Sequence, residues 1–439
     1  MLNFLKKSKG FLGINERNIK YISPFNSKRA INIADSKILT KKILKKAGLP
    51  IAETYYILHN RKELKNFSWR NLPKSFVLKP NRGLGGEGII VLYGKRKNQE
   101  CWIKADKTPL TVNDLNNHIL AILDGDFSII NIPDAAIFEE RIKIHPIFKP
   151  YSHKGIPDIR IIVFNNIPVM AQLRLPTPES GGTANLHRGG IGVGIDMANG
   201  ITTHAVHRDR LINTIPGSKL SFRGIKIPNW RELLQLAVEV QKATGLGFVG
   251  VDIAIDREKG PLILETNARP GLSIQIANIA PLGERLKRVI GLKTKNTPHA
   301  VRISKELFGG EIEEEIEEIS GKKVTGIREK IKIFGPNEKQ YETIAKIDTG
   351  AYRTSLCYSV AEKLNLNKII KKKSVRSALG NEERDIVNLK FSLDNLLIDT
   401  EAFLAKRENM KHDIIIGRKD IKKYLINPSK NIKLITKKL

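Results

Sequence analysis

Cysteine is almost absent from this chain of 439 residues, which carries only Cys101 and Cys357. Two cysteines cannot build a disulfide framework, and their scarcity fits a reducing compartment. Long apolar runs are missing too, because no window approaches the roughly 20 apolar residues of a membrane helix. The N-terminal stretch MLNFLKKSKGFLGINERN has an apolar core too short for a secretory signal. We therefore expect a globular, cytoplasmic protein with no membrane partner.

Acidic residues are also scarce, since 45 Asp and Glu stand against 75 Lys and Arg and give a formal net charge of +30. Such an excess suits an anionic partner, for example nucleic acid or an acidic protein. The basic residues are mostly lysines spread along the chain beside abundant Ile and Asn. No recognition motif with interleaved aromatic side chains accompanies them. Nucleic acid is therefore disfavoured as a partner.

One strongly acidic run interrupts the basic chain. It is GGEIEEEIEEISGKK at residues 309–323, bracketed by glycines. We predict that this run is a linker, although a solvated helix inside one domain has the same pattern. Chain length and the 41% apolar fraction allow two or three domains with buried cores. The predicted domains are residues 1–308 and residues 324–439, separated by the linker at 309–323.

Helical periodicity occurs in two segments of the first domain. SKILTKKILKKAG predicts a helix that ends at Gly48. Its predicted buried face consists of Ile38, Leu39, Ile43, Leu44 and Ala47. NWRELLQLAVEVQKATG predicts a second helix, with Asn229 as N-cap and Gly245 as its end.

Strand patterns lie between these helices. DIRIIVFNNIPVMAQLRLP contains two apolar runs joined at Asn165 and Asn166, which tolerate the positive φ of a tight hairpin turn. GIIVLYG and PLILET are further strand candidates. Helices mixed with hairpins indicate an α+β fold and not a regular alternation of βαβ units.

A glycine-rich cluster, FVLKPNRGLGGEGIIVL, follows the first predicted helix. An apolar strand delivers Lys79, and the loop after it contains Gly83, Gly85, Gly86 and Gly88. Backbone N–H groups of such a loop can wrap phosphate oxygens. The lysine precedes the glycines, so this is no Walker loop, and a plain hairpin between two strands remains the alternative.

Three oxygen-bearing side chains are brought together by a second cluster, GFVGVDIAIDREKGPLILETNARPG. Asp252 closes one predicted strand, and Glu265 and Asn267 lie at the end of the next. Paired strands would place these groups side by side, and Mg²⁺ prefers such hard oxygen ligands. The pattern predicts a magnesium site, whereas ordinary strand caps and turns are the alternative.

These motifs stand in the order and context of a known superfamily. Lys37 in ADSKILTKKILKKAGLP, Lys79 in VLKP, IFEERI at 137–142, and Asp252, Glu265 and Asn267 resemble the ATP-grasp carboxylate–amine ligases. DIR at 158–160, NLHRGG at 185–190 and ETNARPG look most like the RimK-type α-L-glutamate ligases. The resemblance covers roughly residues 12–295. It departs from those ligases at the N-terminus, where a domain that usually precedes the first lysine is largely missing.

The resemblance implies a role for each matched residue. Nucleotide phosphates would be held by Lys37, Lys79, Gly85 and Gly86, and the adenine by a hinge of Glu139, Glu140 and Ile142, mostly through backbone atoms. Phosphate or the acyl substrate would be held by Arg160, Asn185 and Arg188, of which the two arginines would be catalytic. Mg²⁺, with Mn²⁺ as an acceptable replacement, would be bound by Asp252, Glu265 and Asn267. The cofactors implied are thus ATP and Mg²⁺.

The reaction implied is formation of an amide bond through an acyl phosphate. Its substrates would be a small-molecule or peptide carboxylate and an amine, with glutamate or a similar amino acid as the residue added. Two alternatives stay open. One is an ATP-grasp enzyme that acts on a sugar or a cell-envelope precursor, and the other is a nucleotide-gated peptide-binding module.

The C-terminal segment carries a different motif. TIAKIDTGAYRTSLC holds an Asp-Thr-Gly triplet at Asp348, and HDIIIGRKDI at 412–421 supplies an apolar-apolar-Gly element to pack behind it. The segment resembles the small RimK-associated retropepsin-like domains, sometimes labelled ATP-dependent zinc proteases, and implies a small all-β barrel after the ATP-grasp fold. One triplet gives one catalytic carboxylate, whereas aspartic proteolysis needs two. A homodimer through this domain would supply the second, and peptide binding or a purely structural role is the alternative.

Overall fold

The computed structural model describes residues 10–83, 85–96, 101–128, 131–216, 218–309, 323–377, 380–408, 410–428 and 430. The chain divides into two compact units, residues 1–310 and 311–439. Most of the acidic run predicted as a linker, residues 310–322, lies outside the described residues. Within the described ranges, no helix is both long and apolar enough to cross a membrane.

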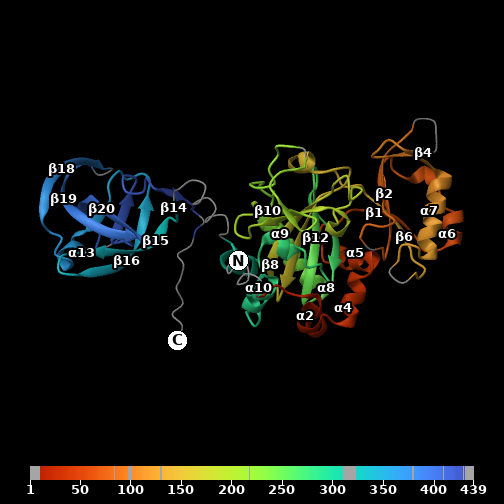
Figure 1. Ribbon diagram of the computed structural model, residues 1–439, viewed down its shortest axis with the longest axis horizontal. Coiled ribbons are helices and arrows are strands. Elements are labelled where there is room, and N and C mark those ends of the chain that lie inside the picture. The colour runs from red at the N-terminus through yellow and green to blue at the C-terminus, as the bar shows by residue number, and fades with distance from the viewer. Residues whose placement is uncertain are drawn as a thin grey trace. The chain divides into compact units, whose positions relative to one another are not determined.

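The larger sheet of the N-terminal unit has seven antiparallel strands (Figure 1). In spatial order they are β11 (Arg210–Ile212), β10 (Thr202–His207), β9 (Ile191–Ile195), β8 (Ile167–Leu175), β7 (Asp158–Phe164), β12 (Phe248–Asp256) and β13 (Gly260–Asn267). The predicted hairpin is confirmed, because Asn165 and Asn166 join β7 to β8 with φ of 50° and 60°. The register of this hairpin shifts between Ile162 and Val163, which marks a β-bulge.

Helices pack on the larger sheet through one continuous apolar core. These helices are α4 (Lys28–Ala34), α8 (Trp230–Thr244), α9 (Ile274–Asn278), α10 (Leu282–Val289) and α11 (Thr297–Phe308), with the short α2 (Ile14–Arg17), η1 (Asn18–Ile22) and α3 (Ser23–Phe25) before them. Helix α8 has the predicted limits and ends at Gly245 with φ of 72°. Asn229 precedes it with φ of 55°, but its side chain does not cap the helix and instead donates to Glu232 Oε2 at 2.8 Å.

A smaller sheet of six strands forms the other half of this unit. Its order is β1 (Thr54–Leu58), β6 (Ala136–Glu139), β2 (Phe76–Pro80), β3 (Ile90–Lys95), β4 (Cys101–Lys104) and β5 (Pro109–Thr111). Helices α6 (Arg61–Lys65) and α7 (Val112–Asp124) accompany it in Figure 1. Trp102, Phe76 and Phe138 are completely buried in its core. Lys79 lies near the end of β2. The prediction that Asp252 closes its strand is wrong, because β12 continues to Asp256 and places Asp252 in its middle.

Helix α5 (Lys37–Lys46) forms as predicted, but its predicted buried face is wrong in part. Leu39 is 42% exposed and Ala47 is exposed, whereas Thr40 and Lys41 are buried beside Leu44. The buried face of the helix thus differs from the predicted one and includes Lys41, which forms an ion pair with Glu139. Gly48 follows the helix with φ of 69°, as the sequence predicts.

The C-terminal unit contains a closed barrel. Strands β15 (Arg328–Phe334), β16 (Gln340–Asp348), β21 (Ile414–Gly417), β17 (Ser355–Cys357), β20 (Leu396–Ala405) and β19 (Gly380–Leu393) follow one another, and β19 pairs back onto β15. Strand β18 (Ile369–Ser377) extends β19 outside this ring, and β14 (Lys323–Thr325) pairs with β22 (Tyr424–Ile426). Helix α13 (Tyr358–Lys363) adds Val360 and Ala361 to the barrel core.

Candidate functional site

The glycine-rich loop between β2 and β3 bends back onto the larger half of the unit. Gly85 and Gly86 have φ of 60° and 86°, which side chains rarely adopt. A Cβ at Gly85 would lie 3.0 Å from Asn185 Nδ2, so the loop approaches the segment that begins with Asn185. In the same region the guanidinium of Arg188 lies 3.6 Å from Glu87 Oε1. The structure thus brings Gly85, Asn185 and Arg188, three predicted site residues, together with Glu87 of the glycine-rich motif.

Lys79 and Lys37 lie at the base of this loop. Lys37 Nζ donates to Gly83 O at 2.9 Å from the first turn of α5. Burial lowers the pKa of Lys37, and the Glu265 carboxylate works in the opposite direction. Glu265 belongs to the larger sheet. Lys37 therefore feels a charge of the larger sheet while its side chain binds the loop of the smaller sheet. Two predicted phosphate-binding residues and one predicted metal ligand therefore share one region.

A buried carboxylate holds Lys79 and a lysine that the sequence analysis did not single out. Glu139, at the end of β6, forms ion pairs with Lys79 Nζ through Oε1 and with Lys41 Nζ through Oε2, the latter at 2.6 Å. Lys41 Nζ also donates to Ala52 O at 2.8 Å. Burial alone would raise the pKa of Glu139, but the two lysines outweigh it and the pKa lies below its usual range. Glu139 was predicted to act mostly through its backbone, whereas its side chain organises both lysines.

Three of the predicted site residues, Glu265, Asp252 and Arg160, lie in one row across the larger sheet. Directly opposed residues in antiparallel strands point to the same face. The row runs over five strands as Glu265, Asp252, Arg160, Gln172 and Gly194. Two residues further along these strands, and so on the same face, Asp158 lies opposite Arg174, and Arg174 lies opposite Gly192. Charged and polar groups therefore occupy a face that an ordinary sheet would cover with apolar side chains.

Asp252, between Glu265 and Arg160 in this row, is completely buried. Arg160 donates two hydrogen bonds to this carboxylate, from Nε to Oδ1 at 2.7 Å and from Nη2 to Oδ2 at 2.6 Å. Arg174 Nη2 reaches the same Oδ2 at 2.7 Å, and Asn267 Nδ2 donates to it at 3.1 Å. Burial raises the pKa of Asp252 less than the two guanidiniums lower it, so this carboxylate stays ionised.

Arg174 joins Asp252 to a second buried carboxylate. Its guanidinium binds Asp158 in a bidentate manner, at 2.6 Å from Nε to Oδ1 and 2.8 Å from Nη2 to Oδ2. Burial and the neighbouring Asp252 raise the pKa of Asp158, whereas Arg174 opposes both. The carboxylates outweigh burial at Arg174 and raise its pKa. Two arginines thus balance two aspartates, and the predicted ligand Asp252 is held in one orientation.

The donor set of the predicted metal site has the chemistry that Mg²⁺ requires. Asp252 and Glu265 face each other across β12 and β13, and the amide of Asn267 is within hydrogen-bonding distance of Asp252. Two carboxylates and one amide oxygen suit a hard cation that takes its other ligands from phosphate and water. In the described part of the chain, no group of three or more His, Cys, Asp or Glu side chains could hold a metal ion by itself. By their chemistry the three residues fit Mg²⁺, while Oδ2 of Asp252 already accepts hydrogen bonds from Arg160, Arg174 and Asn267.

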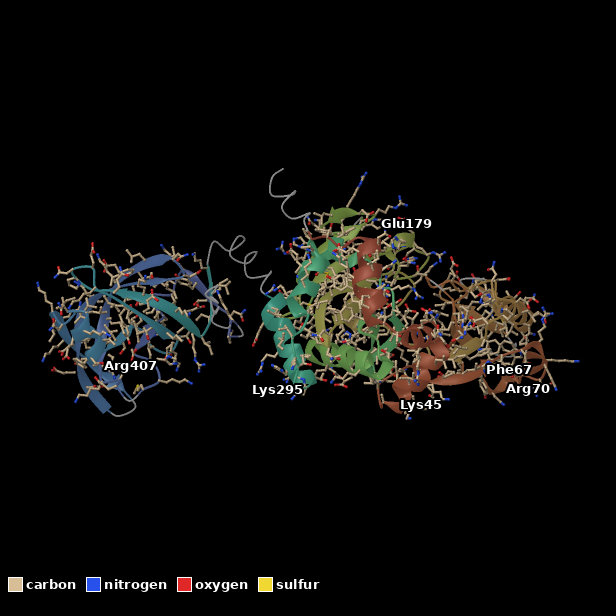
Figure 2. All side chains as sticks on the ribbon, turned by 90° about the horizontal axis from the view of Figure 1, so that it is seen from below. Lys45, Phe67, Arg70, Glu179, Lys295 and Arg407 are labelled. Carbon is tan, nitrogen blue, oxygen red and sulfur yellow. The ribbon has the colours of Figure 1, made fainter. Side chains whose placement is uncertain are left out.

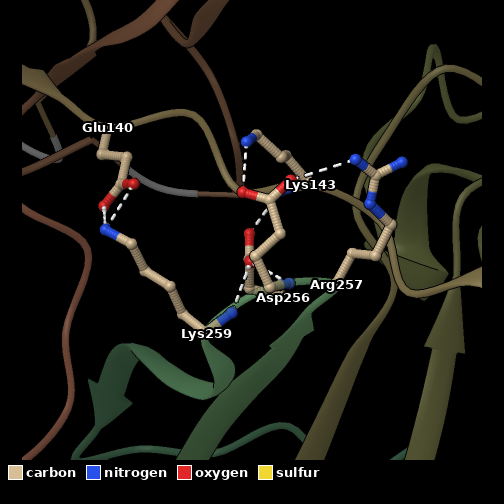
Figure 3. Close-up of polar contacts among 6 residues, drawn as sticks. Glu140, Lys143, Asp256, Arg257 and Lys259 are labelled. Atoms are coloured by element: carbon tan, nitrogen blue, oxygen red, sulfur yellow. Dashed lines mark hydrogen bonds and ion pairs between the residues drawn. The ribbon is translucent and has the colours of Figure 1, made fainter.

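The predicted adenine hinge contacts the turn between β12 and β13 through an ion pair of Glu140 with Lys259 (Figure 3). Glu140 pairs with Lys259 Nζ at 2.5 Å, and its backbone N–H donates to Glu53 O at 2.8 Å. Asp256 accepts the backbone N–H of Lys143 at 2.7 Å. The carboxylate and the N–H of Glu140 are therefore already engaged, which leaves its carbonyl oxygen for a ligand.

An apolar cluster lies under the hinge. Ile142 is 6% exposed and packs with Ala52, Ala254 and Leu262 from three separate segments. This cluster of buried side chains forms an apolar floor under the hinge. Ile142 thus contributes a side chain and not only backbone atoms to the candidate site.

In the C-terminal unit, Asp348 ends β16 and is half-buried. Its Oδ1 accepts the backbone N–H groups of Gly350 at 2.9 Å and Ala351 at 3.3 Å. Strand β21 pairs in parallel with β16 and sets Gly417 opposite Asp348. A Cβ at Gly417 would come within 2.5 Å of the Arg353 backbone, so glycine is required where this chain segment crosses. The IIIG element therefore packs behind the Asp348 loop.

Comparisons with solved structures return ATP-grasp proteins at low identity. The ATP-grasp ligase PsnB with its minimal precursor is 17% identical with a TM-score of 0.33, over 61% of this chain and 63% of that one. D-alanine–D-alanine ligase from Bacillus anthracis with ATP is 14% identical with a TM-score of 0.35, over 63% and 69%. Biotin carboxylase from Campylobacter jejuni is 14% identical with a TM-score of 0.40, over 65% and 55%. This chain thus spans less than two thirds of the length of PsnB.

No curated protein matches the chain. The profile of one protein family, described as sugar-transfer associated ATP-grasp, matches residues 16–291. That range includes both sheets of the N-terminal unit, the lysines around Glu139 and the whole row from Glu265 to Gly194. The chain belongs to the sugar-transfer associated ATP-grasp family.

Proposed function

We propose that the N-terminal unit is an ATP- and Mg²⁺-dependent carboxylate–amine ligase. One observation carries the proposal, namely that buried carboxylates and arginines on one sheet face lie close to buried lysines at a glycine-rich loop of the other. The helix that bears Lys37 touches the strand that bears Glu265, because Thr40 Oγ1 lies 3.5 Å from Thr266 Oγ1. The Glu265 carboxylate also opposes the lowering of the pKa of Lys37 by burial. Membership of an ATP-grasp family supports the nucleotide.

In this proposal the nucleotide lies between the two sheets. Lys37 and Lys79 bind its phosphates, and the backbone of Gly85 and Gly86 adds N–H donors. Adenine lies on the apolar floor that includes Ile142. The backbone of Glu139 and Glu140 lines its edge, and the Glu139 carboxylate keeps Lys79 in position.

The reaction joins a carboxylate to an amine in two displacements. A carboxylate oxygen attacks the γ-phosphorus of ATP, the bond to the β-phosphate oxygen breaks, and ADP leaves. The amine nitrogen then attacks the carbonyl carbon, phosphate leaves, and the nitrogen loses a proton to give the amide. Arg160 and Arg188 lower the repulsion between the anions that meet in the first step, and Asn185 orients the acyl group. Mg²⁺ held by Asp252, Glu265 and Asn267 would supply further positive charge at the phosphates when bound.

The residue added is, on this proposal, glutamate or a similar amino acid, and the acceptor is a peptide or small molecule. The description of the matching family favours a second candidate, in which the substrate is a sugar or a cell-envelope precursor. Both candidates use the same chemistry at the phosphates. They differ in the mass that is added to the acceptor. A binding module that only responds to nucleotide would show no steady turnover.

One experiment separates these candidates. The full-length protein is incubated with ATP, Mg²⁺, the twenty amino acids and a cell extract, and the products are identified by mass spectrometry. The ligase predicts ADP release that depends on an amine and a product heavier by one amino-acid residue. A product heavier by a sugar-derived unit favours the second candidate, and the absence of ADP release contradicts both.

For the C-terminal unit we propose a retropepsin-like barrel in which Asp348 binds or cleaves peptides. The closed ring of six strands and the position of Asp348 at a tight turn beside Gly417 support it. One such carboxylate per chain requires a homodimer for aspartic proteolysis. Tyr352, 54% exposed beside the Asp348 loop, departs from the expected pattern and offers an aromatic surface for a peptide.

A further inference from the structure

The side chain of Gln172 carries a buried polar atom without a partner. The residue is 1% exposed, and within the described residues its Oε1 has no hydrogen-bond partner. A buried amide oxygen left in this state destabilises a fold, and native proteins rarely keep one without a reason. Another buried glutamine of the N-terminal unit, Gln241, is satisfied through both ends of its amide. Other buried polar atoms of the described residues also have no partner, but Gln172 is the one that belongs to the polar row of Asp252 and Arg160, which makes it a candidate for ligand binding.

Gln172 stands inside the polar row of the larger sheet. Arg160 lies directly opposite it on β7, and Gly194 lies opposite it on β9. The backbones of neighbouring strands are about 4.8 Å apart. Gln172 is therefore one strand spacing from Arg160, the arginine proposed to act at the phosphates. It lies on the side of Arg160 away from Asp252 and Glu265. Beyond the proposed metal ligands and Arg160, the next side chain of the row is therefore that of Gln172, an uncharged amide whose oxygen can accept a hydrogen bond.

The amide oxygen lies beneath the segment that carries Asn185 and Arg188. Gly192 has no side chain, and a Cβ there would be 3.3 Å from Gln172 Oε1 and 2.6 Å from Leu186 Cδ2. Leu186, in the short helix η4 (Leu186–Arg188), therefore covers the amide in this state. A ligand that reaches Gln172 past Leu186 would lie next to Asn185, proposed to orient the acyl group, and Arg188, proposed to lower the repulsion between the anions.

We propose that Gln172 Oε1 binds the attacking amine by accepting a hydrogen bond from its N–H group. This inference rests on the ligase function proposed above and names the binding site of its second substrate. The carboxylate and the phosphates bring no N–H or O–H donor at neutral pH, and their charge repels an amide oxygen. A neutral amine donates one N–H and keeps its lone pair for the acyl carbon. Because Gln172 is uncharged, it does not favour the protonated ammonium, which cannot attack.

The test replaces Gln172 with methionine, which has a similar length and no polar atom. Hydroxylamine is the probe amine, because it is small and attacks acyl phosphates, and ADP release is measured with ATP, Mg²⁺ and N-acetylated amino acids, which supply carboxylates without a free amine. For Gln172→Met we expect the half-saturating hydroxylamine concentration to rise roughly tenfold, as for the loss of one hydrogen bond. The half-saturating ATP concentration stays the same. The Tm stays equal or rises, because an unsatisfied polar group is removed.

Gln241→Met is the matched control. Gln241 is 3% exposed, and its amide accepts from Asn166 N at 2.8 Å and donates to Gly247 O at 2.6 Å. This variant should lower the Tm and leave the hydroxylamine dependence unchanged. An unchanged hydroxylamine dependence in Gln172→Met overturns the inference alone, and so does a Tm that falls as in the control. A wild-type protein without amine-dependent ADP release overturns the proposed function itself and this inference with it.

Discussion

Lys41 and Glu139 form an ion pair in the interior of the N-terminal unit, with 2.6 Å between Nζ and Oε2. The two residues come from helix α5 and strand β6, so the pair joins the helix that bears Lys37 to the small sheet that bears Lys79. Glu139 also holds Lys79. One buried carboxylate therefore sets the positions of two lysines, one of which is proposed to bind phosphate.

Removal of the Lys41 charge should destabilise this unit. Lys41→Met leaves Glu139 buried with only one of its two counter-ions, and loss of one partner from a buried pair costs roughly 3 kcal/mol or more. Lys45 is exposed on the same helix (Figure 2), so Lys45→Met should change stability by less than about 0.5 kcal/mol. Denaturant unfolding measures both. Equal stability of the two variants would show that the ion pair contributes nothing.

Glu265→Gln should remove metal-dependent turnover while the fold is kept. The change deletes one ligand charge without a change in volume, and we expect kcat to fall by at least roughly 100-fold, or about 2.7 kcal/mol. Glu306→Gln, at an exposed position on α11, is the control. ADP release over a range of Mg²⁺ concentrations is the measurement, and turnover like that of the wild type would refute the metal assignment.

Lys79→Ala should weaken ATP binding roughly 10- to 100-fold, because a charge-assisted contact to phosphate is lost. Calorimetric titration with ATP gives the Kd directly. Lys74→Ala, exposed just before the same strand, should bind ATP as the wild type does. If Lys79→Ala also binds normally, the glycine-rich segment is only a hairpin.

The single Asp348 carboxylate in each chain leads to a prediction about the oligomeric state of the full-length protein. If the barrel is a retropepsin-like half-site, two Asp348 loops meet across a two-fold axis and the full-length protein sediments as a dimer at high concentration. Asp348→Asn should abolish any peptide cleavage and leave ligation intact. A protein that remains monomeric in sedimentation velocity runs cannot form a two-carboxylate site, which leaves peptide binding as the role of Asp348.

Glu401 makes the barrel sensitive to acid. Hydrogen bonds from Lys371 at 2.9 Å and Arg353 at 2.7 Å lower the pKa of Glu401 to about 2. Since an unfolded Glu has a pKa near 4.3, this contribution to stability is complete above about pH 4.3 and is lost as the pH falls towards 2. Glu401→Gln should therefore lower hydrogen-exchange protection of residues 396–405 at pH 6 but not at pH 2. The same difference at both pH values would contradict the pairing.

Local patterns were sufficient to predict several elements. The hairpin at Asn165 and Asn166 and the end of α8 at Gly245 depend on backbone conformations that particular residue types favour, and both were predicted. Lys41 was not predicted as a buried residue. Its partner Glu139 is distant in sequence, and the apolar pattern of α5 pointed to Leu39, which is exposed. Burial of a lysine depends on a tertiary contact that helical periodicity does not contain.

A β-bulge explains why Arg174 and Gln172 escaped the sequence analysis. Val163 lies opposite Pro168, but Ile162 lies opposite Met170, so one residue of β8 is skipped. A regular hairpin would set Leu173 opposite Asp158, and Arg174 would point to the other face of the sheet. The one-residue shift moves both polar side chains of β8 onto the face that carries Arg160. Turn chemistry predicts where a hairpin reverses but not where its register slips.

The Asp256 carboxylate gives the two sheets a common pivot. Three backbone N–H groups, those of Lys143, Glu258 and Lys259, donate to it at 2.7 to 2.9 Å, and Lys143 belongs to the segment that leaves the small sheet. A rotation of one sheet about this point would displace the glycine-rich loop most, because the loop lies at the far end of β2. On the proposed function, such a rotation would widen the phosphate end of the nucleotide site more than the adenine end, so exchange of the nucleotide should begin at its phosphates.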